Sequence, residues 1–297
     1  MPREFVTMDV FTTAVGTGNP LAVVFGADGL DETRMQMIAR EFNLSETTFV
    51  FSARPDKGVP VVRIFTPARE LPFAGHPVIG TAAALAHEII KSAGAQPTAI
   101  DFEVPAGLVH AKISGRQGHV AATCIVPRLP TLQERSPTPA QAAAALGLIE
   151  ADVLASLSIQ TWDAGYPVTF VPLTTREALQ RTKVDLSKWP STAEFGQPVS
   201  LFPYWKSHAQ KFNARMFAPM LGIREDPATG GAVAAMAGHI LACYDAGNGL
   251  SHYEIEQGVE MGRPSRIDLS LEIVDGSLTR VLIGGAAVEF SRGTLSI

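Results

Sequence analysis

The chain has 297 residues, a formal net charge of −5, and no stretch as long as the roughly 18 to 20 apolar residues of a membrane span. Its 46% hydrophobic and 18% charged residues can supply a buried core and argue against disorder. No basic stripe interleaved with aromatic residues occurs, so we expect no nucleic-acid partner and no membrane partner. The N-terminus lacks the pattern of a signal peptide, which favours a cytoplasmic protein.

The two cysteines, Cys124 and Cys243, lie far apart and without the spacing of a metal site. We therefore expect free thiols in a reducing compartment and no metal. The sequence also lacks a GxGxxG fingerprint, a P-loop, an HExxH motif and a GxSxG elbow. Nicotinamide, ATP and zinc chemistry thus lack support, and no cofactor is predicted.

The first half of the chain combines strand-like and helix-like segments. Alternating or continuous apolar runs predict strands near residues 5–10, 21–25, 45–51 and 59–66, and hairpins over 100–126. Asp31 can cap a helix over residues 32–42, and Gly75 and Pro77 open a second helix. The segment 127–139 is rich in proline and polar residues, so it is the best linker candidate.

The second half follows a similar order. Helices are predicted near residues 140–146, 151–157 and 176–181. Strands are predicted near residues 168–172, 212–219, 253–257, 267–274 and 281–290. A further helix begins in the segment EDPATGGAVAAMAGHILACY, after Pro227.

The helices near Pro77 and Pro227 share a pattern of Pro, Gly three residues on, and Ala two further. The residues before these prolines, His76 and Asp226, are 150 positions apart. Both helices are apolar almost all round, so each must be enclosed rather than laid on a surface. We therefore predict an α+β fold with two pseudo-symmetric halves, each a curved sheet or partial barrel around a central helix. The linker candidate places the halves at residues 1–127 and 128–286.

A helix that begins with Pro and Gly presents backbone N–H groups that attract a carboxylate or phosphate. The repeat provides one such anion-binding helix start in each half, and two of them meet across one cleft if the halves face each other. The alternative is that the glycines merely allow a tight turn into the helix; the matched pair favours anion binding. The predicted substrate-binding residues at these helix starts are Gly75, Gly80, Thr81, Thr229, Gly230 and Gly231.

Four polar residues are further candidates. His76 can donate to a substrate carboxylate or shuttle a proton near neutral pH. Asp226 can hold a substrate amine or hydroxyl, or it can simply cap its helix. Glu46 stands at the start of an apolar strand, where desolvation would suit a general base; a solvent-facing strand edge is the alternative. Asn19 can offer amide hydrogen bonds to a ligand, or it can serve the turn Gly-Asn-Pro.

Five segments together resemble one known family. They are MDVFTTAVGTGNPLAVVF, NLSETTFVF, RIFTPARELPFAGHPVIGTAAAL, MFAPMLGIREDPATGGA and GVEMGRPSRI, in the family's order from about residue 8 to residue 267. This set resembles the phenazine-biosynthesis PhzF-like isomerase/epimerase family over nearly the whole chain. The combination is highly specific, whereas each motif alone is not.

The resemblance implies the diaminopimelate-epimerase fold, with two barrels, each around a central helix, and the site between them. It also implies catalysis without cofactor or metal, a small-molecule carboxylate substrate, a homodimer, and a last strand near residues 287–297 that returns to the first domain. The acid/base glutamate of the SETTF motif falls on Glu46, the histidine of GHP on His76, and the aspartate of DPxTG on Asp226.

Two departures from the family pattern matter. Gly231 stands where many members have a serine, so one hydroxyl donor is lost while the backbone N–H remains. This difference bears on substrate identity more than on reaction class. The paired catalytic cysteines of diaminopimelate epimerase are missing from the two helix starts, which argues against a two-thiol epimerase.

We therefore predict a cofactor-independent isomerase or epimerase that moves a proton on a small carboxylate, with Glu46 as general acid/base and His76 and Asp226 as further catalytic residues. In the phenazine pathway the family's reaction isomerises a dihydro-hydroxyanthranilate. Two alternatives are an amino-acid racemase or epimerase acting at one carbon, and a non-catalytic protein that binds small anions. Glu46 argues against the second, because anion binding gains nothing from a carboxylate.

Overall fold

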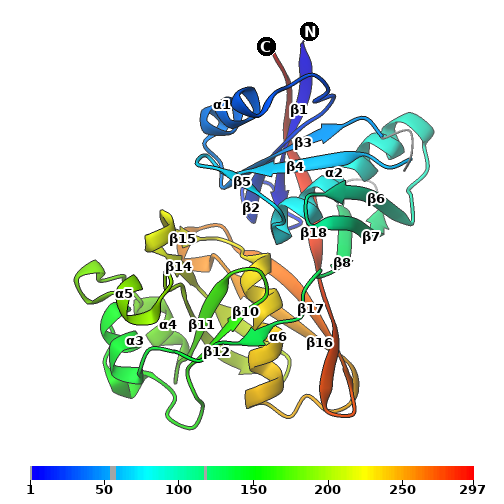
Figure 1. Ribbon diagram of the computed structural model, residues 1–297. Coiled ribbons are helices and arrows are strands. Elements are labelled where there is room, and N and C mark those ends of the chain that lie inside the picture. Colours follow the sequence, from blue (N-terminus) through cyan, green and yellow to red (C-terminus); the bar gives the residue numbers. More distant parts are fainter. Residues whose placement is uncertain (1, 54–57, 117–118) are drawn as a thin grey trace. The chain divides into compact units, whose positions relative to one another are not determined.

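The computed structural model describes residues 2–53, 58–116 and 119–297 (Figure 1). The chain divides into two compact units, one formed by Met1–Pro127 with Ile283–Ile297 and the other by Arg128–Leu282. We call these unit 1 and unit 2. The last strand, β18 (Ser277–Leu295), contributes residues to both.

Unit 1 combines a set of β-strands with two helices. The strands are β1 (Arg3–Val10), β2 (Asn19–Val24), β3 (Glu46–Phe51), β4 (Val61–Phe65), β5 (Glu70–Leu71), β6 (Ala99–Val104), β7 (Gly107–Arg116) and β8 (His119–Ile125). The helices are α1 (Glu32–Phe42) and α2 (Gly75–Ala93). Asp31 caps α1 as expected, because its carboxylate accepts a hydrogen bond from the Arg34 amide at 2.8 Å.

The strand pairings of unit 1 close a circuit around α2 (Figure 1). Pairing runs from β1 through β2, β3, β4, β6, β7 and β8 to β18, which pairs with β1. Helix α2 packs against β1, β2, β3, β6, β7 and β8. Its first twelve residues are almost all buried, which explains why small and apolar side chains occupy every face of the helix.

Unit 2 has a larger set of elements. The strands are β9 (Thr131–Leu132), β10 (Gln160–Asp163), β11 (Pro167–Pro172), β12 (Leu201–His208), β13 (Lys211–Ala214), β14 (Met216–Ala218), β15 (Ile223–Asp226), β16 (Gly249–Gln257) and β17 (Ser265–Val274). The α-helices are α3 (Pro139–Ala145), α4 (Arg176–Arg181), α5 (Thr192–Phe195) and α6 (Gly230–Cys243). Short 3₁₀ helices are η1 (Glu150–Asp152), η2 (Leu186–Lys188), η3 (Pro219–Leu221) and η4 (Val259–Met261).

The two units repeat one order of strand directions. In unit 1 the successive pairs β1–β2, β2–β3, β3–β4, β4–β6 and β6–β7 alternate between antiparallel and parallel. In unit 2 the pairs β10–β11, β11–β12, β12–β13, β13–β16 and β16–β17 alternate in the same order. Helix α6 packs on β9, β10, β11 and β17, as α2 packs on the strands of its own unit.

The structure differs from the predicted elements in several respects. The helix near residues 151–157 is only the turn η1, because Val153 pairs with Leu173 and the Leu154 amide bonds to the Pro172 carbonyl. The strand near 212–219 is divided into β13 and β14 at Arg215. Strands β5, β9, β10, β12 and β15 and helix α5 were not predicted at all.

Within the described ranges, no helix is long and apolar enough to cross a membrane. Cys124 and Cys243 are both free, as their separation predicted.

Candidate functional site

Glu46 and His76 meet in unit 1. Glu46 is the first residue of β3, and His76 lies in the first turn of α2. The Nδ1 atom of His76 is 3.4 Å from Oε2 of Glu46, and the two side chains are 6% and 14% exposed. This burial contradicts the alternative in which Glu46 faces solvent at a strand edge.

The pairing of β2 with β3 explains why Asn19 and Glu46, the first residues of these strands, lie near the same end of the sheet. Strands β2 and β3 are parallel with Leu21 opposite Glu46, so Asn19, the first residue of β2, begins near the same end. Asn19 is fully buried. Gly18 precedes it with a φ of +70°, and a Cβ there would lie 2.4 Å from the Val10 carbonyl oxygen. Only glycine fits this turn.

Burial controls the charge of His76. Desolvation lowers the pKa of His76 to about 3, and the Pro20 carbonyl opposes this shift only weakly. The imidazole is therefore neutral at pH 7. Its Nε2 atom is also buried and has no hydrogen-bond partner among the described residues. His76 thus lies beside Glu46 as a neutral imidazole and not as a cation.

Of the residues predicted at the start of α2, the first and the later ones lie in different surroundings. Gly75 is the first residue of the helix, and no side chain of the N-cap residue Ala74 bonds to the first turn. Gly80 faces the core, because a Cβ there would lie 2.5 Å from Cδ2 of Leu21. Thr81 is fully buried, and its hydroxyl lies 2.9 Å from that of Thr48. Gly80 and Thr81 are therefore placed for packing within unit 1.

Asp226, Thr229 and Gln257 form a hydrogen-bonded cluster in unit 2. Thr229 Oγ1 donates to the Asp226 carboxylate at 2.5 Å. The side chain of Gln257 donates to the Asp226 carbonyl at 2.7 Å and to Thr229 Oγ1 at 3.0 Å, and it accepts from the Thr229 amide at 3.2 Å. Gln257 is fully buried, so this cluster fixes the backbone that leads into α6.

The first turn of α6 differs from the predicted one. Its N-cap is Thr229, three residues after Asp226, and Asp226 is instead the last residue of β15. The Thr229 side chain makes no capping bond to the helix. Gly230 and Gly231 are the first two helical residues, and the ring of Tyr166 lies against Gly231. The amides of this first turn remain the part of α6 suited to an anion.

A buried ion pair holds the strand that ends at Asp226. Arg215 is 8% exposed, and its guanidinium binds both oxygens of Glu225 at 2.8 and 2.9 Å. It also donates to the Thr182 carbonyl at 2.8 Å. Because this bidentate pair is shielded from water, it fixes β15 next to Asp226.

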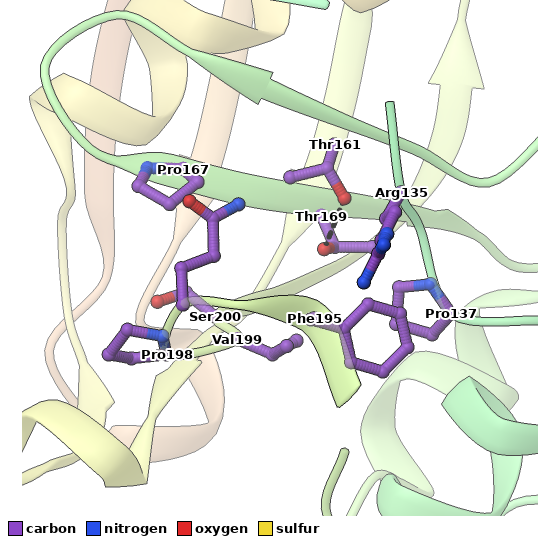
Figure 2. A pocket seen from close by; sticks show the side chains of 10 residues that line it. Arg135, Pro137, Thr161, Pro167, Thr169, Phe195, Pro198, Val199 and Ser200 are labelled. Carbon is purple, nitrogen blue, oxygen red and sulfur yellow. Dashed lines mark hydrogen bonds between the residues drawn. The ribbon is translucent and has the colours of Figure 1, made fainter. Parts of the chain in front are cut away.

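Two further observations concern a metal site and a pocket in the described part of the chain. No group of three or more His, Cys, Asp or Glu side chains in the described part of the chain is placed to hold a metal ion. A small pocket in unit 2 contains Arg135 and the hydrogen-bonded hydroxyls of Thr161 and Thr169 (Figure 2). None of the predicted site residues lines this pocket.

Comparison with known proteins identifies the family. The phenazine biosynthesis-like protein family matches residues 8–293. The chain belongs to this family. An uncharacterized isomerase of Mesorhizobium japonicum is 40% identical, and the alignment covers 99% of both chains. A trans-2,3-dihydro-3-hydroxyanthranilate isomerase of Pseudomonas chlororaphis is 35% identical, again over 99% of both chains.

The fold comparison agrees with this assignment. The solved structure of a Bacillus anthracis phenazine biosynthesis protein of the PhzF family matches with a TM-score of 0.87 at 25% identity, over the full length of both chains. The predicted family and the predicted fold class are thus confirmed. The chain is an isomerase of the PhzF family.

Two residues near α6 of this PhzF-family isomerase, Gln257 and Tyr166, were not predicted from the sequence. Gln257 could have been found, because alternation along β16 puts Tyr253, Ile255 and Gln257 on one buried face. A lone glutamine on such a face must find hydrogen-bond partners. Tyr166 carries no comparable signal, because its contact with Gly231 depends on where a hairpin turn lies in space.

Acid should destabilise the folded chain through two buried histidines. Desolvation lowers the pKa of both His76 and His239 to about 3. The unfolded chain, with histidine pKa values near 6.5, therefore binds more protons between those values, and the free energy of unfolding falls as the pH drops below 6.5. We expect each histidine to contribute a slope of about 1.4 kcal/mol per pH unit.

Urea denaturation of wild type and a His239→Gln variant between pH 7 and pH 5 tests this expectation. The free energy of unfolding of the variant should depend less steeply on pH, by the slope that corresponds to about one bound proton. Carboxylate contributions are the same in both proteins and cancel in the comparison. His208→Gln is the matched control, because His208 is exposed. Equal slopes for wild type and His239→Gln would show that His239 does not carry the effect.

Proposed function

We propose that this PhzF-family isomerase moves a proton on a small carboxylate substrate without a cofactor, with Glu46 as the general acid/base. The observation that carries the proposal is the buried contact between Glu46 and neutral His76 at the end of β3. A carboxylate shielded from water beside a neutral hydrogen-bonding group is suited to take and return a proton. Relatives of the chain are named as isomerases of trans-2,3-dihydro-3-hydroxyanthranilate.

In the proposed reaction, the Glu46 carboxylate removes a proton from a carbon next to the substrate's π-system. The electron pair of the broken C–H bond spreads over that π-system and the carboxylate. Protonated Glu46 then returns the proton to another carbon, so the double bonds shift and the substrate's composition is unchanged. His76 lies with Nδ1 3.4 Å from Oε2 of Glu46 and relays no net charge, because it stays neutral.

Other residues have binding roles in this proposal. In unit 1, Asn19 lies on β2, the strand paired with the one that begins at Glu46, and the backbone of Gly75 lies on α2 next to His76. In unit 2, Asp226 and Thr229 offer a hydrogen-bonded carboxylate and hydroxyl, and Gly230 and Gly231 offer first-turn amides. Backbone amides at a helix start stabilise negative charge that develops during the reaction.

Proton NMR in D₂O tests the proposed function. The protein is incubated with trans-2,3-dihydro-3-hydroxyanthranilate and with a panel of amino acids and hydroxy acids, beside Glu46→Gln and Glu41→Gln variants. Glu41 is an exposed residue of α1 and serves as the matched control. We expect deuterium uptake by wild type and Glu41→Gln, and none by Glu46→Gln.

The labelled position separates the reaction classes. Deuterium at a carbon other than the one that lost hydrogen supports an isomerase, whereas uptake with inversion at one carbon supports an epimerase. Equal uptake by Glu46→Gln and wild type would refute the assignment of the base. Tight binding of a carboxylate by wild type without any exchange would refute catalysis of proton transfer on the compounds tested.

A further inference from the structure

Two glycines on α6 each receive an aromatic ring. Gly231 and Gly238 are seven residues apart, so they lie on one face of the helix, two turns from each other. A Cβ on Gly238 would lie 2.3 Å from the ring of Trp162, and a Cβ on Gly231 would lie 2.8 Å from the ring of Tyr166. Trp162 belongs to β10, and Tyr166 immediately precedes β11. The β10–β11 hairpin thus seats two rings on one face of α6.

The two contacts differ in what they place beside the helix. Gly238 is buried in the middle of α6, so the Trp162 ring there serves packing. Gly231 is the second residue of α6, half-buried, and the atoms of Tyr166 nearest to it are Cε1, Cζ and the hydroxyl oxygen. The hydroxyl oxygen lies 3.6 Å from the position of a Cβ on Gly231. The phenol end of Tyr166 therefore lies at the amide-bearing end of the helix.

The hairpin holds Tyr166 in this position. Asp163 and Pro167 are paired at the ends of β10 and β11, and the Asp163 carboxylate accepts a hydrogen bond from the Gly165 amide at 2.6 Å. Gly165 has a φ of +141°, a conformation that favours glycine, which directs the chain into Tyr166. With Trp162 seated on Gly238 at one end of the hairpin, the turn cannot shift along α6 without losing a ring contact.

We propose that Tyr166 is a specificity-determining residue of this isomerase, whose hydroxyl hydrogen-bonds to the substrate group bound at the first turn of α6. The inference rests on the proposed function, which assigns substrate binding to that turn. A phenol hydroxyl adds a neutral donor beside the amides of Gly230 and Gly231. Gly231 is then half of a matched pair, because any side chain at this position would displace the Tyr166 ring.

The chemistry narrows the substrate group that fits. The amides and the phenol hydroxyl all donate, so the group between them must be an acceptor and preferably an anion, such as a carboxylate. Tyr166 thus selects the polarity of the bound group.

Isothermal titration with 3-hydroxyanthranilate, a stable aromatic relative of the trans-2,3-dihydro-3-hydroxyanthranilate named above, measures the role of the hydroxyl. Tyr166→Phe keeps the ring and should weaken binding about 3- to 10-fold, as expected for one lost hydrogen bond, with an unchanged melting temperature. Tyr244→Phe is the matched control, because Tyr244 is half-buried at the other end of α6. Loss of the Tyr244 hydroxyl should leave the dissociation constant of 3-hydroxyanthranilate unchanged.

A second pair of variants tests the match between ring and glycine. Gly231→Ser should weaken binding at least about 10-fold, because the new side chain meets the Tyr166 ring. Adding Tyr166→Ala should restore part of that binding, since the space is then open. A packing role alone predicts the reverse, in which Tyr166→Ala lowers the melting temperature and restores no binding.

The outcomes separate this inference from the proposed function. Equal dissociation constants for Tyr166→Phe and wild type, with Glu46-dependent deuterium uptake intact, would overturn the inference alone. If wild type exchanges another compound of the panel but does not bind 3-hydroxyanthranilate, the KM of that compound replaces the dissociation constant, with the same expected ratio. Absence of binding and of exchange with every compound would overturn both.

Discussion

We expect Glu46→Gln to lower kcat by about 10²- to 10⁴-fold, the range that a positioned general acid/base supplies. Glutamine keeps the size and polarity of the side chain, so the contact with Nδ1 of His76 can persist. It cannot accept the substrate proton, and only the proton-transfer step should suffer. We expect the free energy of unfolding to stay within about 0.5 kcal/mol of wild type, measured by urea denaturation.

A Glu46→Asp variant tests whether the position of the carboxylate matters in addition to its presence. Aspartate keeps the carboxylate but draws it back by one methylene, so it should lose less activity than glutamine yet remain well below wild type. Steady-state kinetics of the three proteins at saturating substrate gives the comparison. A Glu46→Gln protein that keeps more than about a tenth of wild-type kcat would remove Glu46 from the proton-transfer step.

Much of the fold can be read from the sequence because two helices are unusual. A surface helix shows a polar face, whereas α2 and α6 have small or apolar residues almost all round, and this pattern predicted helices enclosed by sheets. Strand β12 escaped prediction because its third residue is Pro203. Proline cannot donate a ladder hydrogen bond, which argues against a central strand. In the structure Pro203 contributes its carbonyl, which accepts from the Arg215 amide.

Some residues of the candidate site were predicted from motifs that place polar atoms locally, and their roles stay predictions. His76 stands in the first turn of α2 and the pairing of β2 with β3 places Glu46 opposite Leu21. The two side chains meet with 3.4 Å between Nδ1 and Oε2. The repeated Pro-x-x-Gly pattern was less informative, because Gly80 serves packing against Leu21. Glycine in a helix can admit a ligand or a neighbouring side chain, and the sequence does not distinguish these uses.

Gln257 illustrates a different kind of dependence, in which a buried side chain positions a candidate site residue. Its amide satisfies the Asp226 carbonyl, the Thr229 hydroxyl and the Thr229 amide at once. Gln257→Leu fills the space but leaves the carbonyl and the amide without these partners. An unsatisfied buried polar group costs about 1–3 kcal/mol, so we expect the free energy of unfolding to fall by about 2–4 kcal/mol. Gln180→Leu, at an exposed position of α4, should change it by less than about 0.5 kcal/mol.

Gln257→Leu should also reduce kcat/KM by about 10- to 100-fold at temperatures where the protein stays folded. Without the Gln257 hydrogen bonds, Asp226 and Thr229 lose their alignment with the substrate. If Gln257 acts through Asp226, its substitution should cost little more once Asp226→Asn has been introduced, since residues of one network are not additive. Urea denaturation and steady-state kinetics of the single and double variants measure both effects. Additive losses of kcat/KM would mean that Gln257 affects turnover by a route other than Asp226. A stable, fully active Gln257→Leu protein would show that the hydrogen bonds of Gln257 do not fix the backbone that leads into α6.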